Sequence, residues 1–324
     1  MAEYFCRMSK SRKSLCSGGA ARKDPRTLSA VNTRRPGMIP QKTENYEMHR
    51  RGEACYLTFP QLDRYQELRH LFTTRCGGFS EGPCATWNLG FGLGNDPDTP
   101  ENRARNIGVL AECMGICPEN LVFTWQTHTT NIRNVTEEDR GCGATRERTY
   151  QDVDGLVTDC RGVALVTLHA DCNPIYFYDP RRHVIGLAHS GWRGTLDGIG
   201  SRMVDKMQSD YGCNPGDLIC GIGPSLCRNC FEVDADVAEL FAGRYGDFSE
   251  FSRYDGGRNK YYIDLWELIR RQLTSAGVRR ENVACMELCT KENTDVFFSH
   301  RGQGGKRGLM AACMMLTPPE QEEV

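Results

Sequence analysis

Short apolar runs separated by helical patterns are the feature that most restricts how this chain can fold. Runs of this length, rich in Val, Ile, Leu and Phe, are typical of β-strands. They lie at residues 68–73, 121–125, 163–168, 175–178, 184–188, 218–222 and 309–316. Because strands and helices are interleaved without a strict βαβ order, the pattern predicts an α/β (α+β) fold, a single compact domain in which helices cover a mixed β-sheet.

Three helices are predicted from their starts, stops and periodicity. The first follows Thr99-Pro100-Glu101, where a capping residue precedes a proline and an acid in the first turn. The second is expected to start near Thr195, with apolar residues at 196, 199, 203 and 207 on one face. The third runs from about residue 264 to 276, and Gly277 provides its stop.

The first 50 residues differ in composition from the rest of the chain. They contain eleven Lys and Arg residues against four acidic residues, and large apolar side chains are sparse. Such a segment buries too little apolar surface to offset the entropy lost on ordering. We therefore expect residues 1–50 to be a basic, disordered N-terminal tail and residues 51–324 to be the folded domain.

Charge, apolar content and cysteine content exclude several classes of protein. A net charge of −2 gives no electrostatic reason to expect nucleic acid or an anionic membrane as a partner. No apolar stretch approaches the roughly 18 residues of a membrane helix, and the N-terminus lacks the apolar core of a secretory signal. The odd count of 17 cysteines favours free thiols in a reducing compartment. We expect a cytoplasmic protein, monomeric or a small homo-oligomer.

Side chains able to carry chemistry gather in three passages at the ends of predicted strands, where a rigid sheet presents functional groups. Three of the seven histidines, His128, His169 and His189, occur there. The passages are Thr124-Trp125-Gln126-Thr127-His128, His169-Ala170-Asp171-Cys172-Asn173-Pro174 and His189-Ser190-Gly191-Trp192-Arg193-Gly194. A β-β-β meander through this region would bring the strand ends close together. Each residue taken alone is typical of a structural core position, and it is their joint occurrence that makes the three passages candidates for a functional site.

A series of ordered sequence blocks extends from about residue 56 to 316. The blocks are Phe72-Thr73-Thr74-Arg75, Gly77-Gly78-Phe79-Ser80, Asn88-Leu89-Gly90, Asn102-Arg103, Trp125-Gln126-Thr127-His128, Ala170-Asp171-Cys172, His189-Ser190-Gly191-Trp192-Arg193-Gly194, Gly221-Ile222-Gly223-Pro224-Ser225 and Phe298-Ser299-His300-Arg301. In these blocks the chain resembles the YfiH-type family, also called laccase-domain or polyphenol-oxidase-like proteins. The resemblance implies a YfiH/CNF1-like sandwich fold and purine nucleoside phosphorylase activity. Adenosine, inosine, guanosine or methylthioadenosine would react with inorganic phosphate to give free base and (methylthio)ribose 1-phosphate, with adenosine deaminase as a side activity.

The resemblance also implies that His128, Cys172 and His189 are zinc ligands. Two imidazoles and one thiolate suit Zn²⁺, and three protein ligands leave a fourth tetrahedral position for water or substrate. Together with Asp171 these residues are the candidate catalytic groups, because Asp171 could orient a histidine or act as acid or base. We expect His169 to be structural or to support a ligand from behind, because adjacent strand positions point to opposite faces and His169 and Cys172 are an odd number of positions apart.

Phosphate and sugar contacts are expected from three further residues. Arg75 lies beside Gly77-Gly78, whose backbone permits close approach of a ligand. Arg193 lies just before the helix expected at Thr195, and helix N-termini attract anions. Asn88 is the candidate sugar contact, and a loop-holding role for it stays open.

Several alternatives use the same residues differently. A copper polyphenol oxidase would need many more histidines, with His-x-His pairs that this chain lacks. A zinc deaminase would carry the motifs His-x-Glu and Pro-Cys-x-x-Cys. This chain has His169-Ala170-Asp171, with aspartate in place of glutamate, and Leu226-Cys227-Arg228-Asn229-Cys230, with leucine in place of proline. A metal-free hydrolase with Cys172 as nucleophile and a histidine as base stays open, and metal content distinguishes it. Cys227 and Cys230, with Cys213 and Cys220 upstream, could bind a second metal, although their spacing is irregular.

Overall fold

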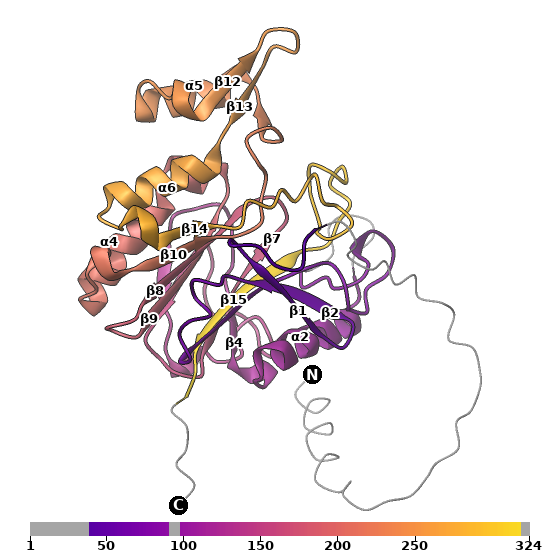
Figure 1. Cartoon of the computed structure of the whole chain (residues 1–324). Helices are drawn as coiled ribbons and strands as arrows, with labels where there is room; N and C mark the ends of the chain where they lie inside the picture. The colour runs from indigo at the N-terminus through magenta and orange to yellow at the C-terminus, as the bar shows by residue number, and fades with distance from the viewer. Residues whose placement is uncertain (1–38, 91–97, 319–324) are drawn as a thin grey trace, which may run out of the picture. The chain divides into compact units, whose positions relative to one another are not determined.

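Two six-stranded mixed sheets form the centre of the fold in the computed structural model, which describes residues 39–90 and 98–318 (Figure 1). The first sheet comprises, in spatial order, β1 (Glu47–Arg51), β2 (Ala54–Thr58), β3 (Leu68–Thr73), β15 (Met310–Leu316), β7 (Ala164–His169) and β4 (Leu121–Phe123). The second comprises β14 (Val283–Cys285), β10 (Ile219–Ile222), β8 (Asn173–Asp179), β9 (Val184–Ser190), β6 (Gly155–Thr158) and β5 (Ile132–Asn134). The predicted α+β class is confirmed, but the strands build two sheets rather than one.

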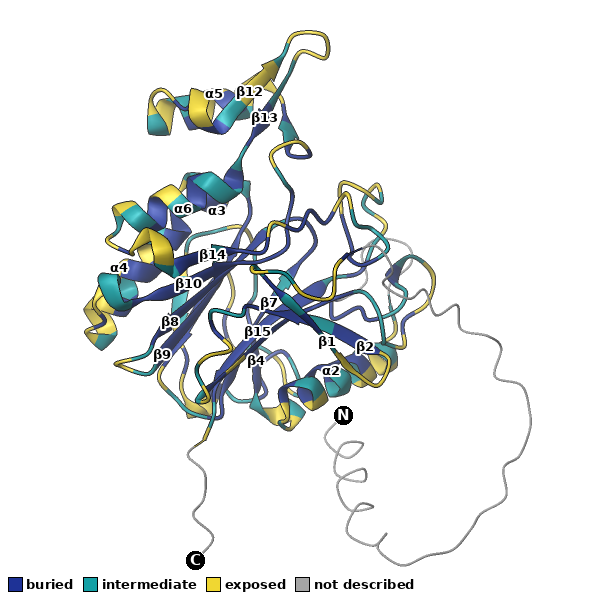
Figure 2. Ribbon diagram, viewed as in Figure 1, coloured by how far each residue is buried: buried dark blue, intermediate teal, exposed yellow. Residues whose placement is uncertain are grey.

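The two large sheets pack face to face and carry helices on their outer faces. Along β8, Tyr176 belongs to the core shared with the first sheet, whereas Ile175 and Phe177 pack under the helices α4 (Ile199–Tyr211) and α6 (Leu265–Ser275). The first sheet is covered by α2 (Pro100–Met114). The central strands β8, β9 and β15 are buried on both faces (Figure 2), and their sequences are therefore largely apolar instead of alternating.

The described part of the chain also contains a smaller three-stranded sheet and two further α-helices. This sheet has the order β11 (Glu232–Val233), β13 (Lys260–Ile263) and β12 (Ser252–Asp255), and it packs with α5 (Ala235–Tyr245) through Phe241 and Ile263. The other helix is α3 (Trp192–Leu196). Within residues 39–90 and 98–318, no helix has the length and apolar character to cross a membrane.

The helix boundaries follow the capping signals in the sequence with one exception. Thr99 and Asp264 cap α2 and α6, since each side chain accepts a hydrogen bond, from Asn102 N and Glu267 N respectively, at 3.1 Å. The helix expected near Thr195 is instead two helices, α3 and α4. They are separated at Gly198, whose φ of 77° is incompatible with a continuous right-handed helix.

The expected tail boundary at residue 50 is wrong, because the folded domain already includes residues before it. Strand β1 pairs with β2 in antiparallel register, and Ile39, Tyr46 and Met48 belong to the core between the sheets. Their burial depends on partners distant in sequence, which the local composition does not show. Residues 1–38 of the expected tail lie outside the described residues.

Candidate metal centre

Three side chains from separate segments converge where the two large sheets face each other. His128 follows β4, Cys172 lies between β7 and β8, and His189 lies near the end of β9. Their ligand atoms lie within 4.8 Å of one another, and Cys172 Sγ is 3.9 Å from His128 Nε2. Ideal tetrahedral zinc bonds would place sulfur and nitrogen about 3.5 Å apart. Small side-chain rotations therefore suffice to bring the three atoms to one ion.

The predicted meander is only partly correct, although the strand ends meet. Strands β8 and β9 are paired neighbours, with Asn173 opposite Ser190, whereas β7 belongs to the other sheet. The chain crosses between the sheets through residues 170–172, where Asp171 has a φ of 92°. His128 also has a positive φ, 66°. Non-glycine residues in this region are held by surrounding contacts and often occur at functional sites.

Asp154 organises the cluster, and the sequence analysis did not identify it. Its fully buried carboxylate accepts a hydrogen bond from His189 Nδ1 at 2.8 Å and from the His128 backbone N–H at 3.1 Å on the same oxygen. The other oxygen accepts the backbone N–H groups of Thr127 and Thr129 and the Thr129 hydroxyl. A proton held on Nδ1 of His189 leaves Nε2 as the ligand atom, the arrangement common in zinc proteins.

Gly191 leaves space for His128 and Cys172. A Cβ atom at this position would lie 2.8 Å from His128 Cδ2 and 3.2 Å from Cys172 Sγ. Both distances are shorter than ordinary van der Waals contacts, and the backbone of Gly191 is extended with a φ of −70°. Glycine is therefore required here for its size rather than for its conformational freedom.

The electrostatics of the cluster favour a thiolate. Burial alone would raise the pKa of Cys172, but the neighbouring His189 and His128 outweigh it and lower the pKa to about 6. Burial opposes protonation of His189, whereas Cys172 and Asp154 together raise its pKa to about 9. Cysteine binds metal as thiolate, while His189 has to release a proton when its Nε2 coordinates an ion.

The other two residues of the central passage have protein partners. His169 is buried and lies 2.7 Å through Nε2 from the Thr167 hydroxyl and 3.1 Å through Nδ1 from the Cys172 carbonyl oxygen, as expected of a structural histidine. Asp171 accepts hydrogen bonds from the Thr290 hydroxyl at 2.6 Å and the Arg301 backbone N–H at 2.7 Å. The histidine-orienting role considered for Asp171 thus belongs to Asp154.

The three expected phosphate and sugar residues lie in different environments. Arg75 donates hydrogen bonds to the carbonyl oxygens of Ala85 and Thr294. Arg193 is exposed at the start of α3, with its guanidinium 4.2 Å from the Trp192 ring centroid. Asn88 is 1% exposed. Its side-chain NH₂ group donates hydrogen bonds to the Gly90 carbonyl oxygen and the Asp98 carboxylate, and its side-chain oxygen accepts from the backbone N–H groups of Gly90 and Leu309. These contacts leave Asn88 little capacity to bind a substrate.

Arg307 is an arginine near the cluster that the sequence analysis missed. It interacts electrostatically with Asp171 and Cys172, and burial lowers its pKa. Its buried Nε has no hydrogen-bond partner among the described residues, and its Nη2 is 3.5 Å from His300 Nδ1. A buried donor without a partner is costly. Arg307 stands next to Gly308, shortly after the block Phe298-Ser299-His300-Arg301. This position was the sequence signal that could have marked Arg307 as a candidate site residue.

Comparison with known proteins places this geometry in a family. The family model described as multi-copper polyphenol oxidoreductase laccase matches residues 69–317. The purine nucleoside phosphorylase YlmD of Geobacillus stearothermophilus is 39% identical over 242 residues, which are 74% of this chain and 87% of that protein. The purine nucleoside phosphorylase of Bacteroides thetaiotaomicron is 34% identical over 261 residues, 80% of this chain and 96% of that protein.

Solved structures support the same assignment. The crystal structure of YfiH from Bacillus licheniformis has a TM-score of 0.77 and 32% identity, covering 83% of this chain and 99% of that one. The crystal structure of YlmD from G. stearothermophilus also has a TM-score of 0.77, with 34% identity, covering 85% of this chain and all of that one. By sequence and by fold, this chain belongs to the YfiH family of laccase-like proteins.

Proposed function

We propose that this protein is a zinc-dependent purine nucleoside phosphorylase. Three relatives named purine nucleoside phosphorylase are 34–39% identical to it over most of both chains. The observation that carries the zinc assignment is the hydrogen bond from His189 Nδ1 to the buried Asp154, since it presents Nε2 beside His128 and Cys172. With three protein ligands, Zn²⁺ would supply a Lewis acid with one position open to a substrate oxygen or water.

The donor set fits zinc better than the copper cluster that the family description suggests. Multicopper chemistry needs several more imidazoles, and both ring nitrogens of the adjacent His169 already have protein partners. Within residues 39–90 and 98–318, the only other group of possible ligands contains three cysteines, one glutamate and no histidine. Mixed imidazole and thiolate ligands suit zinc.

Phosphorolysis requires a cation that holds phosphate beside the sugar. Arg307 is the candidate that the contacts favour over Arg75 and Arg193, because it is partly buried near Cys172 and its Nε has no partner among the described residues. An arginine can hold phosphate through two parallel N–H···O bonds. Phosphate attack at the sugar C1′ then breaks the bond to the base, giving free purine and ribose 1-phosphate.

Two other activities remain alternatives at the same site. Deamination of adenosine would need water rather than phosphate, delivered to the purine ring instead of the sugar. A metal-free hydrolase is favoured by one observation, the lowered pKa of Cys172 beside His128 at 3.9 Å, which resembles a thiolate–imidazole pair. Deamination does not need phosphate, and the metal-free hydrolase does not need a metal ion. Activity measured without phosphate and without metal therefore distinguishes both from zinc-dependent phosphorolysis.

Product analysis with adenosine tests the proposal. Purified, zinc-loaded protein should release adenine and ribose 1-phosphate only when inorganic phosphate is present, because phosphate is a reactant. Inosine formed at equal rates with and without phosphate would reveal deamination alongside. Adenine release that is equally fast without phosphate would mean hydrolysis, and full activity after complete chelation of zinc would overturn the metal assignment.

Variants of the three arginines identify the phosphate contact. Replacing Arg307 with glutamine should raise the KM for phosphate with little change in zinc content. Arg193→Gln is the matched control, with the same loss of charge at an exposed position near the cluster. A raised KM for phosphate in Arg193→Gln or Arg75→Lys, with Arg307→Gln unchanged, would move the phosphate site to that other arginine.

A further inference from the structure

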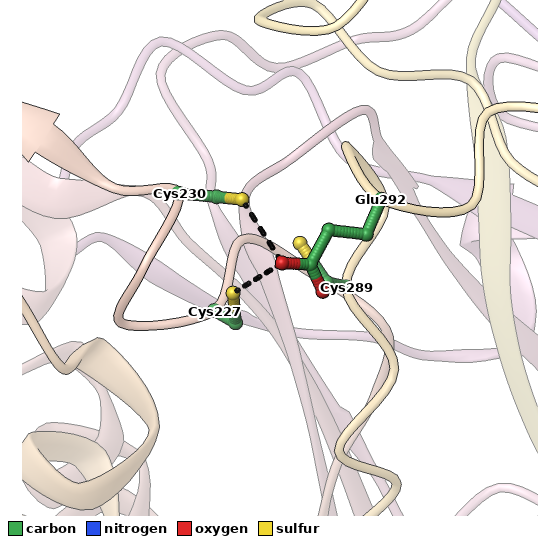
Figure 3. A group of neighbouring side chains, drawn as sticks. All are labelled: Cys227, Cys230, Cys289 and Glu292. Atoms are coloured by element: carbon green, nitrogen blue, oxygen red, sulfur yellow. Dashed lines mark hydrogen bonds between the residues drawn. The ribbon is translucent and has the colours of Figure 1, made fainter.

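A second group of metal-ligand side chains lies outside the centre described above. Cys227, Cys230, Cys289 and Glu292 place one ligand atom each within 4.8 Å of the others (Figure 3). Cys230 and Cys289 are buried, Cys227 is half-buried, and Glu292 is exposed at the surface. Cys213 and Cys220, which the sequence suggested as partners, lie in the core beneath α4 and α6 instead. The cysteine spacing looked irregular because the third thiol lies about 60 residues downstream.

The distances within this group match a metal site. The Cys227 and Cys230 sulfur atoms lie 3.7 Å and 3.6 Å from the same oxygen of Glu292. In a tetrahedral zinc site the sulfur and carboxylate ligands are about 3.5 Å apart. A dithiol that only forms a disulfide would account for Cys227 and Cys230, and it would leave the convergence of Cys289 and Glu292 unexplained.

Backbone hydrogen bonds hold the segments that carry the three cysteines in place. Residues 227–230 form a turn in which Cys230 N and Phe231 N both donate to the Cys227 carbonyl oxygen. The second segment runs parallel to the first through Ser225, whose N–H donates to Leu288 O and whose carbonyl accepts from Thr290 N. The site is therefore prearranged by the fold, as stable metal sites require.

We propose that Cys227, Cys230, Cys289 and Glu292 form a second zinc site, which is structural. Four protein ligands complete a tetrahedron without an open position, as in structural zinc sites. A sulfur-rich tetrahedral set selects zinc over the hard ions calcium and magnesium.

The position of this site indicates what it stabilises. Cys230 precedes β11, so the ion would fasten the start of the three-stranded sheet to the segment after β14. Both segments also touch Asp171, because Leu226 N donates to its carbonyl oxygen at 3.1 Å and the Thr290 hydroxyl to its carboxylate. The second ion would thus stabilise the two segments that position Asp171 next to Cys172.

Metal content measured in a Cys172→Ala background tests the second site alone, whether or not the proposed function is correct. After dialysis against a weak chelator, this variant should retain about one zinc ion per chain, and the wild type about two. Adding Cys227→Ser and Cys289→Ser should remove the remaining ion. Adding Cys117→Ser instead, at an exposed cysteine outside both groups, should leave it bound.

Two further measurements keep the test decisive if the double cysteine variant does not fold. Cobalt-substituted Cys172→Ala protein should show thiolate-to-cobalt charge-transfer absorption, although its first site has lost its thiolate. Glu292→Ala changes an exposed residue, so it should fold and release zinc to a chelator about tenfold faster. A folded Cys172→Ala protein without zinc, with iron instead, or with a Cys227–Cys230 disulfide in freshly purified protein would overturn the proposal.

Discussion

Replacing Asp154 with asparagine exchanges one carboxylate oxygen for an NH₂ group. This carboxylate connects the His128 loop to His189, because it accepts hydrogen bonds from both. The carboxylate accepts five hydrogen bonds, two on one oxygen and three on the other. An amide keeps only one acceptor oxygen, so in either orientation its NH₂ group faces at least two N–H donors. If it faces His189, the imidazole satisfies it only by moving its own proton to Nε2, which then cannot bind metal.

The structure gives the size of the expected effect. A buried donor left without a partner costs about 1–3 kcal/mol, so two donors reduce the free energy of unfolding by about 2–6 kcal/mol. Loss of a carboxylate behind a ligating histidine lowers metal affinity by about 10–100-fold. Burial alone would raise the pKa of Asp154, but His189 and the backbone N–H groups of Thr127 and Thr129 lower it below its ordinary value. Its stabilisation is therefore present above about pH 4 and is lost as the pH falls through the native pKa. The difference between wild type and variant should therefore shrink in acid.

Denaturant unfolding of the metal-free proteins and competition titration with a zinc chelator measure the two effects separately. The matched control is Asp152→Asn, which removes the same charge from an exposed residue of the same region. Among the described residues, the Asp152 carboxylate accepts a single side-chain hydrogen bond, from the Thr127 hydroxyl. We expect this control to change stability by less than about 0.5 kcal/mol. If Asp154→Asn behaves like Asp152→Asn in both assays, Asp154 does not organise the site.

Three further predictions follow from individual contacts. Deleting residues 1–48 should destabilise the protein by at least about 4 kcal/mol in denaturant unfolding, because Ile39, Tyr46 and Met48 leave the core; deleting residues 1–38 should not, and equal stability of the two truncations would contradict this. Gly191→Ala should lower zinc affinity without lowering the unfolding free energy of the metal-free protein, since its Cβ would press on His128 and Cys172; unchanged affinity in competition titration would count against the steric argument. Arg75→Lys should lower the Tm in thermal unfolding through lost bonds to Ala85 and Thr294, and an unchanged Tm would show that these bonds contribute little.

Local signals explain which parts of the fold the sequence could predict. Strand β3 matches its prediction at both ends, and the Thr99 cap of α2 and the stop of α6 before Gly277 were recognised because such signals depend on neighbouring residues. Strand β1 was assigned to the tail because its outward residues are polar, and only pairing with β2 makes it part of the sheet. The helix with Ile199, Met203 and Met207 on its buried face is confirmed as α4, but its expected start near Thr195 was wrong, because a glycine inside an apolar periodicity can be either a helical residue or a break.

The candidate metal centre shows the same division. Its three ligands occur in short motifs, whereas the supporting Asp154 lies 26 residues from His128 and 35 from His189. An acidic residue between Val153 and Gly155, directly before the apolar β6, was the available signal. Arg307 and Glu292 were missed because Asp171 and Cys172, and Cys227 and Cys230, lie far from them in the sequence. The spacing Cys289-x-x-Glu292 was the local signal available for Glu292.

The place of the last strand has a consequence for synthesis of the protein. Strand β15 lies inside the first sheet, between β3 and β7, and not at its edge. While the chain is being made, β1–β3 and the β4–β7 pair can form, but each presents an open hydrogen-bonding edge until residues 310–316 arrive. Premature termination shortly before residue 310 would therefore leave two unjoined half-sheets with exposed edges, a product prone to aggregation rather than a slightly shortened enzyme.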